Sequence, residues 1–116
     1  MTPEFGSPTH READDDAHTS TVVHVSGEID LHHAGELENL ITTALSDAQP
    51  STKIVVDLSN SSFCDSAGLN ALIRAREAAL RTGHTLSLAA PSHQMLRLLE
   101  LTGTAALFPL QPAVDS

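Results

Sequence analysis

Two short polar segments of the sequence contain the side chains best suited to chemistry. Gly27–Asp30 follows a β-branched stretch, and Asp65–Ser66 precedes a stretch with helical periodicity. A serine hydroxyl at a helix start is a candidate acceptor for a phosphoryl group, because the free N–H groups and the positive end of the helix dipole favour a phosphate there. Asp65 also has a structural interpretation, since aspartate is a preferred N-cap residue. The two interpretations are compatible.

Two further residues beside Ser66 have a structural and a functional interpretation. Gly68 lies one turn into the expected helix, where glycine costs about 1 kcal/mol relative to alanine. Close packing of the helix on a neighbour would explain it, and so would access for a partner. Cys64 follows Phe63 and precedes the helix, and we interpret it as a small buried hydrophobic residue rather than a redox sensor.

The residue types of a Ser-His-Asp hydrolase are present as Ser66, His93 and either Asp57 or Asp65. The nucleophile elbow Gly-x-Ser-x-Gly is absent, however, because residues 64–68 read Cys-Asp-Ser-Ala-Gly. A hydrolase is therefore the weaker alternative, and we predict that the chain is not an enzyme.

The adjacent histidines His32 and His33 are the strongest candidates for metal binding, with His24 not far away in sequence. Adjacent helical residues point about 100° apart and rarely bind one ion together. The single cysteine excludes an internal disulfide and a zinc site made of cysteines. We expect no metal and no other cofactor, and interpret the two histidines as exposed residues that contact a partner.

The composition limits the class of partner. The chain has 116 residues, with six Lys and Arg against 15 Asp and Glu, and a formal charge of -9. This balance argues against nucleic acid and anionic membranes as partners, because both require a basic surface. No apolar stretch approaches the roughly 18 residues of a membrane span, and the N-terminus lacks a signal pattern. We therefore expect a cytoplasmic protein that binds other proteins.

The elements that must position these side chains alternate along the chain. Strands are expected at about 21–26, 53–58 and 85–89, and helices after Asp30, over about 67–81, and from Ser92 to Gly103. Residues 59–62 are interpreted as a polar loop, and 107–110 as a short edge strand. This order predicts an α/β domain with a mainly parallel sheet of four to five strands, packed by three to four helices. In such a sheet, functional groups gather beyond the carboxyl ends of the strands.

One domain accounts for most of the chain. Residues 20–112 are expected to form it, and 113–116 a C-terminal tail. Residues 1–19 are Pro/Gly-rich and acidic, with three aspartates at 14–16, and we interpret them as a flexible arm that contains at most one weak edge strand. The sequence Glu-Phe-Gly-Ser at 4–7 is interpreted as part of a tag.

Three sequence segments together resemble the STAS family. They read Gly-Glu-Ile-Asp-Leu at 27–31, Val-Asp-Leu-Ser at 56–59 and Phe-Cys-Asp-Ser-Ala-Gly-Leu at 63–69. The resemblance covers about residues 20–110 and is closest to the bacterial anti-sigma factor antagonists. It implies a STAS-like domain, monomeric when free, that binds an anti-sigma factor and so releases a sigma factor.

The resemblance also implies a switch at Ser66. The anti-sigma factor of such a system is itself a serine kinase that binds the ATP, and a phosphatase reverses its action. Phosphorylation of the serine after the motif aspartate, here Ser66, releases the antagonist. Ala67 stands where many relatives carry a second hydroxyl, so Ser66 is the single acceptor in the motif. The expected partner surface consists of Asp30, His32, His33, Asp65, Ser66, Ala67, Gly68, Leu69 and Asn70.

An alternative function within the same fold is an accessory subunit of a transporter ATPase. Such a subunit would bind its ATPase constitutively and would need no phosphorylation. Phosphate transfer to Ser66 distinguishes the two functions.

Overall fold

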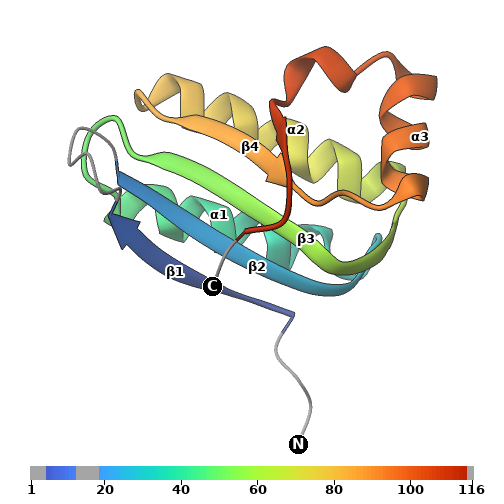
Figure 1. Ribbon diagram of the computed structural model, residues 1–116, viewed down its shortest axis with the longest axis horizontal. Coiled ribbons are helices and arrows are strands. Elements are labelled where there is room, and N and C mark those ends of the chain that lie inside the picture. The colour runs from blue at the N-terminus through green and yellow to red at the C-terminus, as the bar shows by residue number, and fades with distance from the viewer. Residues whose placement is uncertain (1–4, 13–18, 115–116) are drawn as a thin grey trace, which may run out of the picture.

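A computed structural model of the chain describes residues 5–12 and 19–114. Its elements, in chain order, are β1 (Gly6–Glu12), β2 (Thr19–Ile29), α1 (Ala34–Asp47), β3 (Lys53–Cys64), α2 (Ser66–Arg81), β4 (Thr85–Ala89), α3 (His93–Thr102), a 3₁₀ turn (Ala105–Leu107) and β5 (Leu110–Gln111). The strands form one sheet in the order β1-β2-β3-β4-β5, as Figure 1 shows. β1 is antiparallel to β2 and the other pairs are parallel. The predicted α/β fold with a mainly parallel sheet is therefore confirmed.

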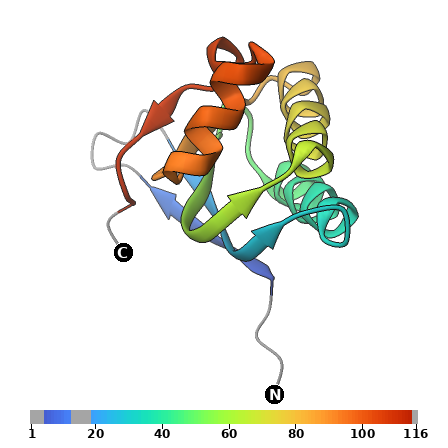
Figure 2. The same cartoon turned by 90° about the vertical axis from the view of Figure 1, so that its right-hand side faces the viewer.

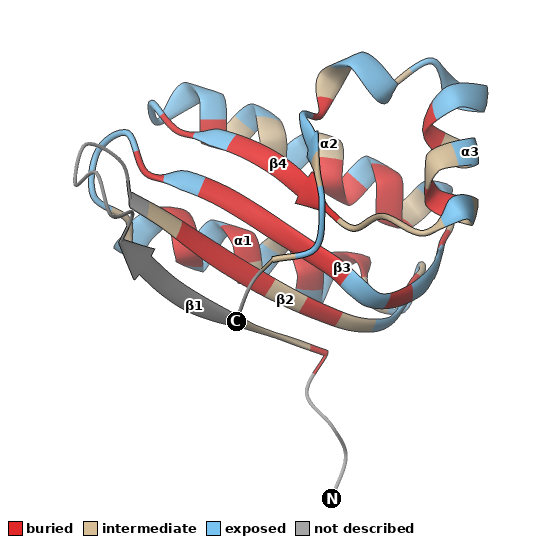
Figure 3. Ribbon diagram, viewed as in Figure 1, coloured by how far each residue is buried: buried red, intermediate tan, exposed pale blue. Residues whose placement is uncertain are grey.

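The core lies between the sheet and the helices. Helices α1 and α2 cover the same face of the sheet (Figure 2). Side chains of β2 and β3 that point to this face, such as Val23, Ile54 and Val56, are fully buried against Leu37 of α1 and Leu72 of α2. Figure 3 shows buried positions along the middle of β2, β3 and β4. The β-branched strands and the apolar stripe of each helix were the features that predicted these elements.

The C-terminal segment covers part of the other face of the sheet. After β5 it passes in front of the sheet in Figure 1. Val114 packs there on a small buried cluster formed by Val22, Val55 and Ala89. No helix in the described residues is long and apolar enough to cross a bilayer.

The segment expected to be a flexible arm contributes an edge strand. β1 pairs with β2 from Gly6↔Val25 to Glu12↔Thr19. Phe5, within the four residues interpreted as part of a tag, is buried in the main core, and its carbonyl accepts a hydrogen bond from Ser26 N at 2.8 Å. Residues 5–12 are therefore part of the folded domain, whereas the three aspartates at 14–16 lie outside the described residues.

Two predicted boundaries were wrong. β3 continues through residues 59–62, which were expected to be a loop, because β2 also continues and pairs with it at Ser26↔Asn60 and Ile29↔Cys64. The two strands shift register twice over this stretch, as bulged strands do at the ends of sheets next to functional sites. The first helix begins at Ala34 rather than directly after Asp30, and a turn separates the two.

Candidate functional site

The junction between β3 and α2 presents the candidate acceptor. Cys64 ends β3, Asp65 is the N-cap of α2, and Ser66 is the first helical residue and is exposed. The Asp65 carboxylate accepts a hydrogen bond from Gly68 N, with 2.9 Å between Oδ1 and N. The predicted capping role of Asp65 is confirmed, and this cap fixes the helix start that carries the Ser66 hydroxyl.

Asp30 organises a turn and does not cap α1, which corrects the prediction for this residue. Its Oδ1 accepts hydrogen bonds from His32 N at 3.1 Å and His33 N at 3.2 Å. The N-cap position of α1 is taken by His33, whose side chain makes no capping hydrogen bond. An aspartate can satisfy the N–H groups of a turn in the same way as those of a helix, which is why the sequence pattern did not distinguish the two.

His33 links the Asp30 turn to the N-terminal segment. Its Nδ1 lies 3.0 Å from Asp30 Oδ1, and its ring stacks on Phe5 with a centroid separation of 4.6 Å. Desolvation opposes ionisation of the Asp30 carboxyl, but the hydrogen bonds and the charge of His33 outweigh it and lower the pKa of Asp30. Asp30 is therefore an anion at neutral pH.

The two loops meet at Asp65. Its second carboxylate oxygen, Oδ2, accepts a hydrogen bond from Leu31 N at 3.3 Å, and its own N–H donates to Ile29 O at 3.1 Å. Strand order brings this about, because β2 and β3 are parallel neighbours whose carboxyl ends reach the same edge of the sheet. The acidic turn and the serine therefore belong to one surface.

The predicted partner residues differ in how far they reach the surface. Ser66, Asn70 and His32 are exposed, and Asp30, His33, Asp65 and Ala67 are partly buried. Gly68 and Leu69 are buried and offer a partner no exposed side chain. A Cβ at Gly68 would overlap the carbonyl oxygen of Ile29, so close packing explains this glycine.

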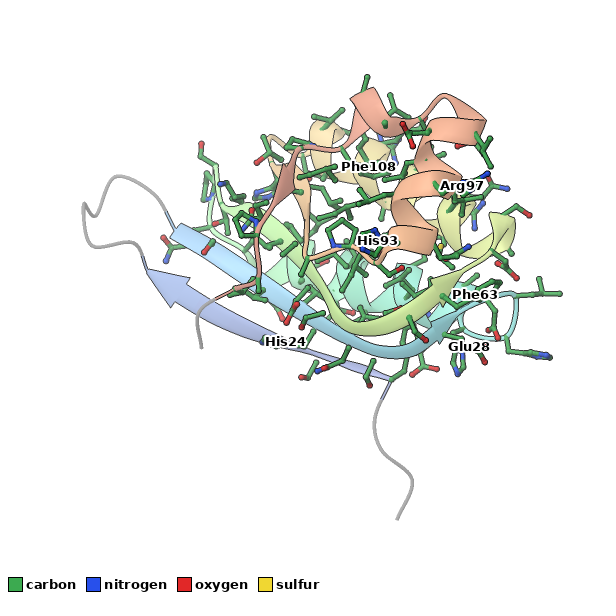
Figure 4. The ribbon with its side chains drawn as sticks, turned by 45° about the vertical axis from the view of Figure 1, so that its right-hand side comes forward. His24, Glu28, Phe63, His93, Arg97 and Phe108 are labelled. Carbon is green, nitrogen blue, oxygen red and sulfur yellow. The ribbon has the colours of Figure 1, made fainter. Side chains whose placement is uncertain are left out.

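Three residues that the structure places in this region were not predicted from the sequence to be part of it. Leu31 is 72% exposed and Phe63 39%, so two apolar side chains lie beside the acidic groups. Figure 4 shows Phe63 near Glu28 at this end of the sheet. Gln94 of α3 hydrogen-bonds both backbone groups of Cys64, at 2.8 Å to N and 2.7 Å to O. No local pattern marks a glutamine for this role, since its partner lies 30 residues earlier in the chain.

Three alternative chemistries involve residues of this region. Within the described residues, no hydrogen bond joins Ser66 to a histidine, and Asp57 pairs with His24, with 2.9 Å between Oδ2 and Nδ1. Cys64 is buried as predicted, and this burial together with the nearby charge of Asp65 raises the pKa of its thiol to about 12. Among the side chains that the structure describes, no three of the types His, Cys, Asp or Glu are placed to hold a metal ion.

Comparison with known proteins gives a consistent family. Residues 13–111 match the family model described as Mlab, STAS domain. The chain is 33% identical over 93 residues to an anti-sigma-B factor antagonist of Staphylococcus aureus, covering 80% of this chain and 84% of the relative.

Solved structures agree with this match. The chain resembles an anti-sigma factor antagonist from Mycobacterium paratuberculosis, with a TM-score of 0.71 and 35% identity over 94% of this chain and 89% of that one. It also resembles the anti-sigma factor antagonist SpoIIAA in its unphosphorylated form, with a TM-score of 0.62 and 25% identity over 83% and 81% of the two chains. The expected resemblance is confirmed, and the chain belongs to the STAS domain family, in the group of the anti-sigma factor antagonists.

Proposed function

We propose that this chain binds an anti-sigma factor that is also a serine kinase, and that phosphorylation of Ser66 ends the binding and returns the sigma factor to inhibition. The observation that carries the proposal is the exposed Ser66 at the start of α2, on one surface with Asp65 and the Asp30 turn. The partner supplies ATP and catalysis, and a phosphatase resets the switch.

The charge on this surface explains how a phosphate would act. A phosphoserine carries about -1.5 to -2 charges at neutral pH. Next to the carboxylates of Asp65 and Asp30, this charge would crowd three anionic groups together, and a complex that closes over the unmodified hydroxyl would have to desolvate them and make room for the phosphate. A loss of about 3 kcal/mol in binding free energy corresponds to more than a hundredfold in affinity.

The proposed switch is local. Asp65 is held by hydrogen bonds to Gly68, Leu31 and Ile29, so the backbone on either side of Ser66 already has its partners. A phosphate on the exposed hydroxyl breaks none of them. Among the relatives, SpoIIAA is known in an unphosphorylated and in a phosphorylated form, which supports a switch of this kind.

The test is phosphate transfer measured by intact mass. The purified chain is incubated with ATP and each candidate anti-sigma serine kinase. One added phosphate is expected on the wild type and none on Ser66→Ala. Ser62→Ala is the matched control, because Ser62 is also exposed but lies on β3, and it should be labelled like the wild type. Labelling at another residue, or no labelling with any kinase, would contradict the proposal.

A second measurement addresses the consequence for binding. Ser66→Asp is expected to weaken the complex with the same kinase, while its melting temperature stays close to that of the wild type. Equal affinity of the two forms would count against electrostatic control. Stable co-purification with a transporter ATPase, with Ser66 unmodified, would instead favour the accessory-subunit function.

A further inference from the structure

Gln94, the second residue of α3, binds the backbone of Cys64 from the side opposite β2. Its Oε1 accepts from Cys64 N at 2.8 Å, and its Nε2 donates to Cys64 O at 2.7 Å. We propose that Gln94 is a positioning residue for Ser66: it fixes the end of β3 so that the acceptor hydroxyl is presented to the kinase in one orientation. This inference rests on the proposed function of Ser66.

The end of β3 needs such a partner because β4 stops early. The β3–β4 pairing ends at Asp57↔Ala89, whereas β3 continues to Cys64. On its other side β3 keeps its neighbour, since Ile29 pairs with Cys64. Cys64 is only 1% exposed, and leaving its N–H and C=O without partners would cost free energy. The glutamine amide offers a donor and an acceptor like those of a peptide group and so takes the place of the missing strand.

The other hydrogen bonds at the junction do not replace this pair. Asp65 N donates to Ile29 O, and the two carboxylate oxygens of Asp65 accept from Leu31 N and Gly68 N. These partners belong to β2, to the turn after it, and to α2 itself. Within the described residues, Gln94 provides the side-chain hydrogen bonds that join the junction to α3. Without it, Cys64 loses both hydrogen bonds on that side, and the backbone two residues before Ser66 becomes free to move.

A shift of this backbone should affect the phosphoryl-transfer step more than binding. Transfer requires the hydroxyl to lie in line with the phosphoryl group, and a misplacement of about 1 Å can cost a hundredfold in rate. Within the described residues, Gln94 makes no hydrogen bond to the exposed groups of the site, which are Leu31, His32 and Phe63. Loss of Gln94 should therefore lower kcat of the kinase for this substrate and leave KM little changed.

Three variants separate positioning from general stability. Gln94→Ala removes both hydrogen bonds, whereas Gln94→Glu keeps an acceptor for Cys64 N and loses the donor to Cys64 O. Gln111→Ala is the matched control, because it removes another glutamine hydrogen bond, from Ser87 Oγ at 3.0 Å, on strand β5. Melting temperatures show whether each variant is folded. If Gln94→Ala does not fold, the positioning role of Gln94 is tested by comparing Gln94→Glu with the wild type.

Amide hydrogen exchange at Cys64 and phosphorylation kinetics are measured on the same samples. In Gln94→Ala the Cys64 amide is expected to exchange at least about tenfold faster, and kcat to fall at least about tenfold with KM within about twofold. Gln94→Glu should retain protection of the Cys64 amide and show an intermediate kcat. Gln111→Ala should match the wild type in both measurements.

Each adverse result has a distinct meaning. Unchanged exchange at Cys64 in Gln94→Ala would overturn the hydrogen-bonded pair itself. Faster exchange with wild-type kcat would leave Gln94 a structural residue and overturn its positioning role, as would a rise in KM alone. If no kinase phosphorylates the wild type, the proposed function fails and the positioning role fails with it, whereas the exchange data still decide whether the pair exists.

Discussion

The carboxylate of Asp65 joins the two loops of the site by accepting a hydrogen bond from the backbone N–H of Leu31, with 3.3 Å between Oδ2 and N. The same carboxylate caps α2 through Gly68 N at 2.9 Å. One side chain therefore sets both the start of the helix that carries Ser66 and the position of the turn that carries Leu31. Changes at Asp65 should alter stability and partner binding together.

Replacement of Asp65 tests this double role. Asp65→Ala is expected to lower the free energy of unfolding by about 1–2 kcal/mol, as loss of an N-cap does. Asp65→Asn retains an acceptor for the helix N–H groups and should lose less than half as much. Urea unfolding of both variants measures the difference. Equal stabilities of Asp65→Ala and the wild type would mean that the cap contributes nothing.

Gly68 and Gly35 form a matched pair of helical glycines. A Cβ at Gly68 would overlap Ile29 O, so Gly68→Ala should lower the free energy of unfolding by about 1–3 kcal/mol despite the better helix propensity of alanine. At Gly35 in α1, no atom of the described residues lies within 4 Å of such a Cβ apart from the chain neighbours and the backbone of the helix itself, and Gly35→Ala should raise stability by up to about 1 kcal/mol. Opposite signs in urea unfolding are the expected result, and a stabilised Gly68→Ala would contradict the close packing.

The pair of Asp57 and His24 should make stability depend on pH in the acid range. Burial raises the pKa of Asp57, but hydrogen bonds from Ser59 and His24 outweigh it and lower the pKa below its ordinary value of 3.8. A lowered pKa contributes stability that is present above about pH 4 and is lost as the pH falls through the folded-state value. Asp57→Asn should therefore be less stable than the wild type at pH 6, and the difference should shrink below pH 4.

Unfolding curves of Asp57→Asn and the wild type from pH 6 to pH 2.5 provide this measurement. Asp47→Asn is the control, because Asp47 is exposed at the end of α1. A stability difference for Asp57→Asn that does not change with pH would show that its carboxylate is not the source.

Cys64 should be unreactive in the folded protein. Its thiol is buried and its pKa is raised to about 12, so almost no thiolate forms at pH 8. A disulfide reagent that releases a coloured product when it reacts with a thiol should label Cys64 slowly in the native chain. In denaturant the same reagent should label Cys64 within seconds. Cys64→Ser gives the blank. Rapid native labelling would mean that the end of β3 opens far more readily than its hydrogen bonds suggest.

Sequence periodicity was a good guide wherever a segment is stabilised by its own apolar face. The helices around Leu37 and Leu72 were predictable because their buried residues recur at the helical period. The strand at 85–89 was predictable from the alternation of apolar and polar residues in its sequence, although four of its five residues are buried. The polar end of β3 was not, since its hydrogen bonds come from β2 and from Gln94. β1 was obscure for the same reason: Gly6–Glu12 is almost without apolar residues and is held through its backbone to β2.

The same distinction applies to the candidate site: features set by local sequence could be predicted, and features set by distant backbone groups could not. The cap at Asp65 and the exposed helix start at Ser66 could be predicted because both are local features of sequence. The turn at Asp30 and the pairing of Gln94 with Cys64 depend on where distant backbone groups come to lie, and sequence spacing contains no such information.

The edge position of β1 has a consequence for handling the protein. A chain begun at residue 20, the boundary that composition suggested, would lack both β1 and Phe5. The edge of β2 that pairs with β1 would then lose its partner strand, and such edges recruit strands from other molecules. We therefore expect the short, polar N-terminal strand to reduce self-association, and a truncated protein should be tested for self-association before any loss of partner binding is attributed to the site.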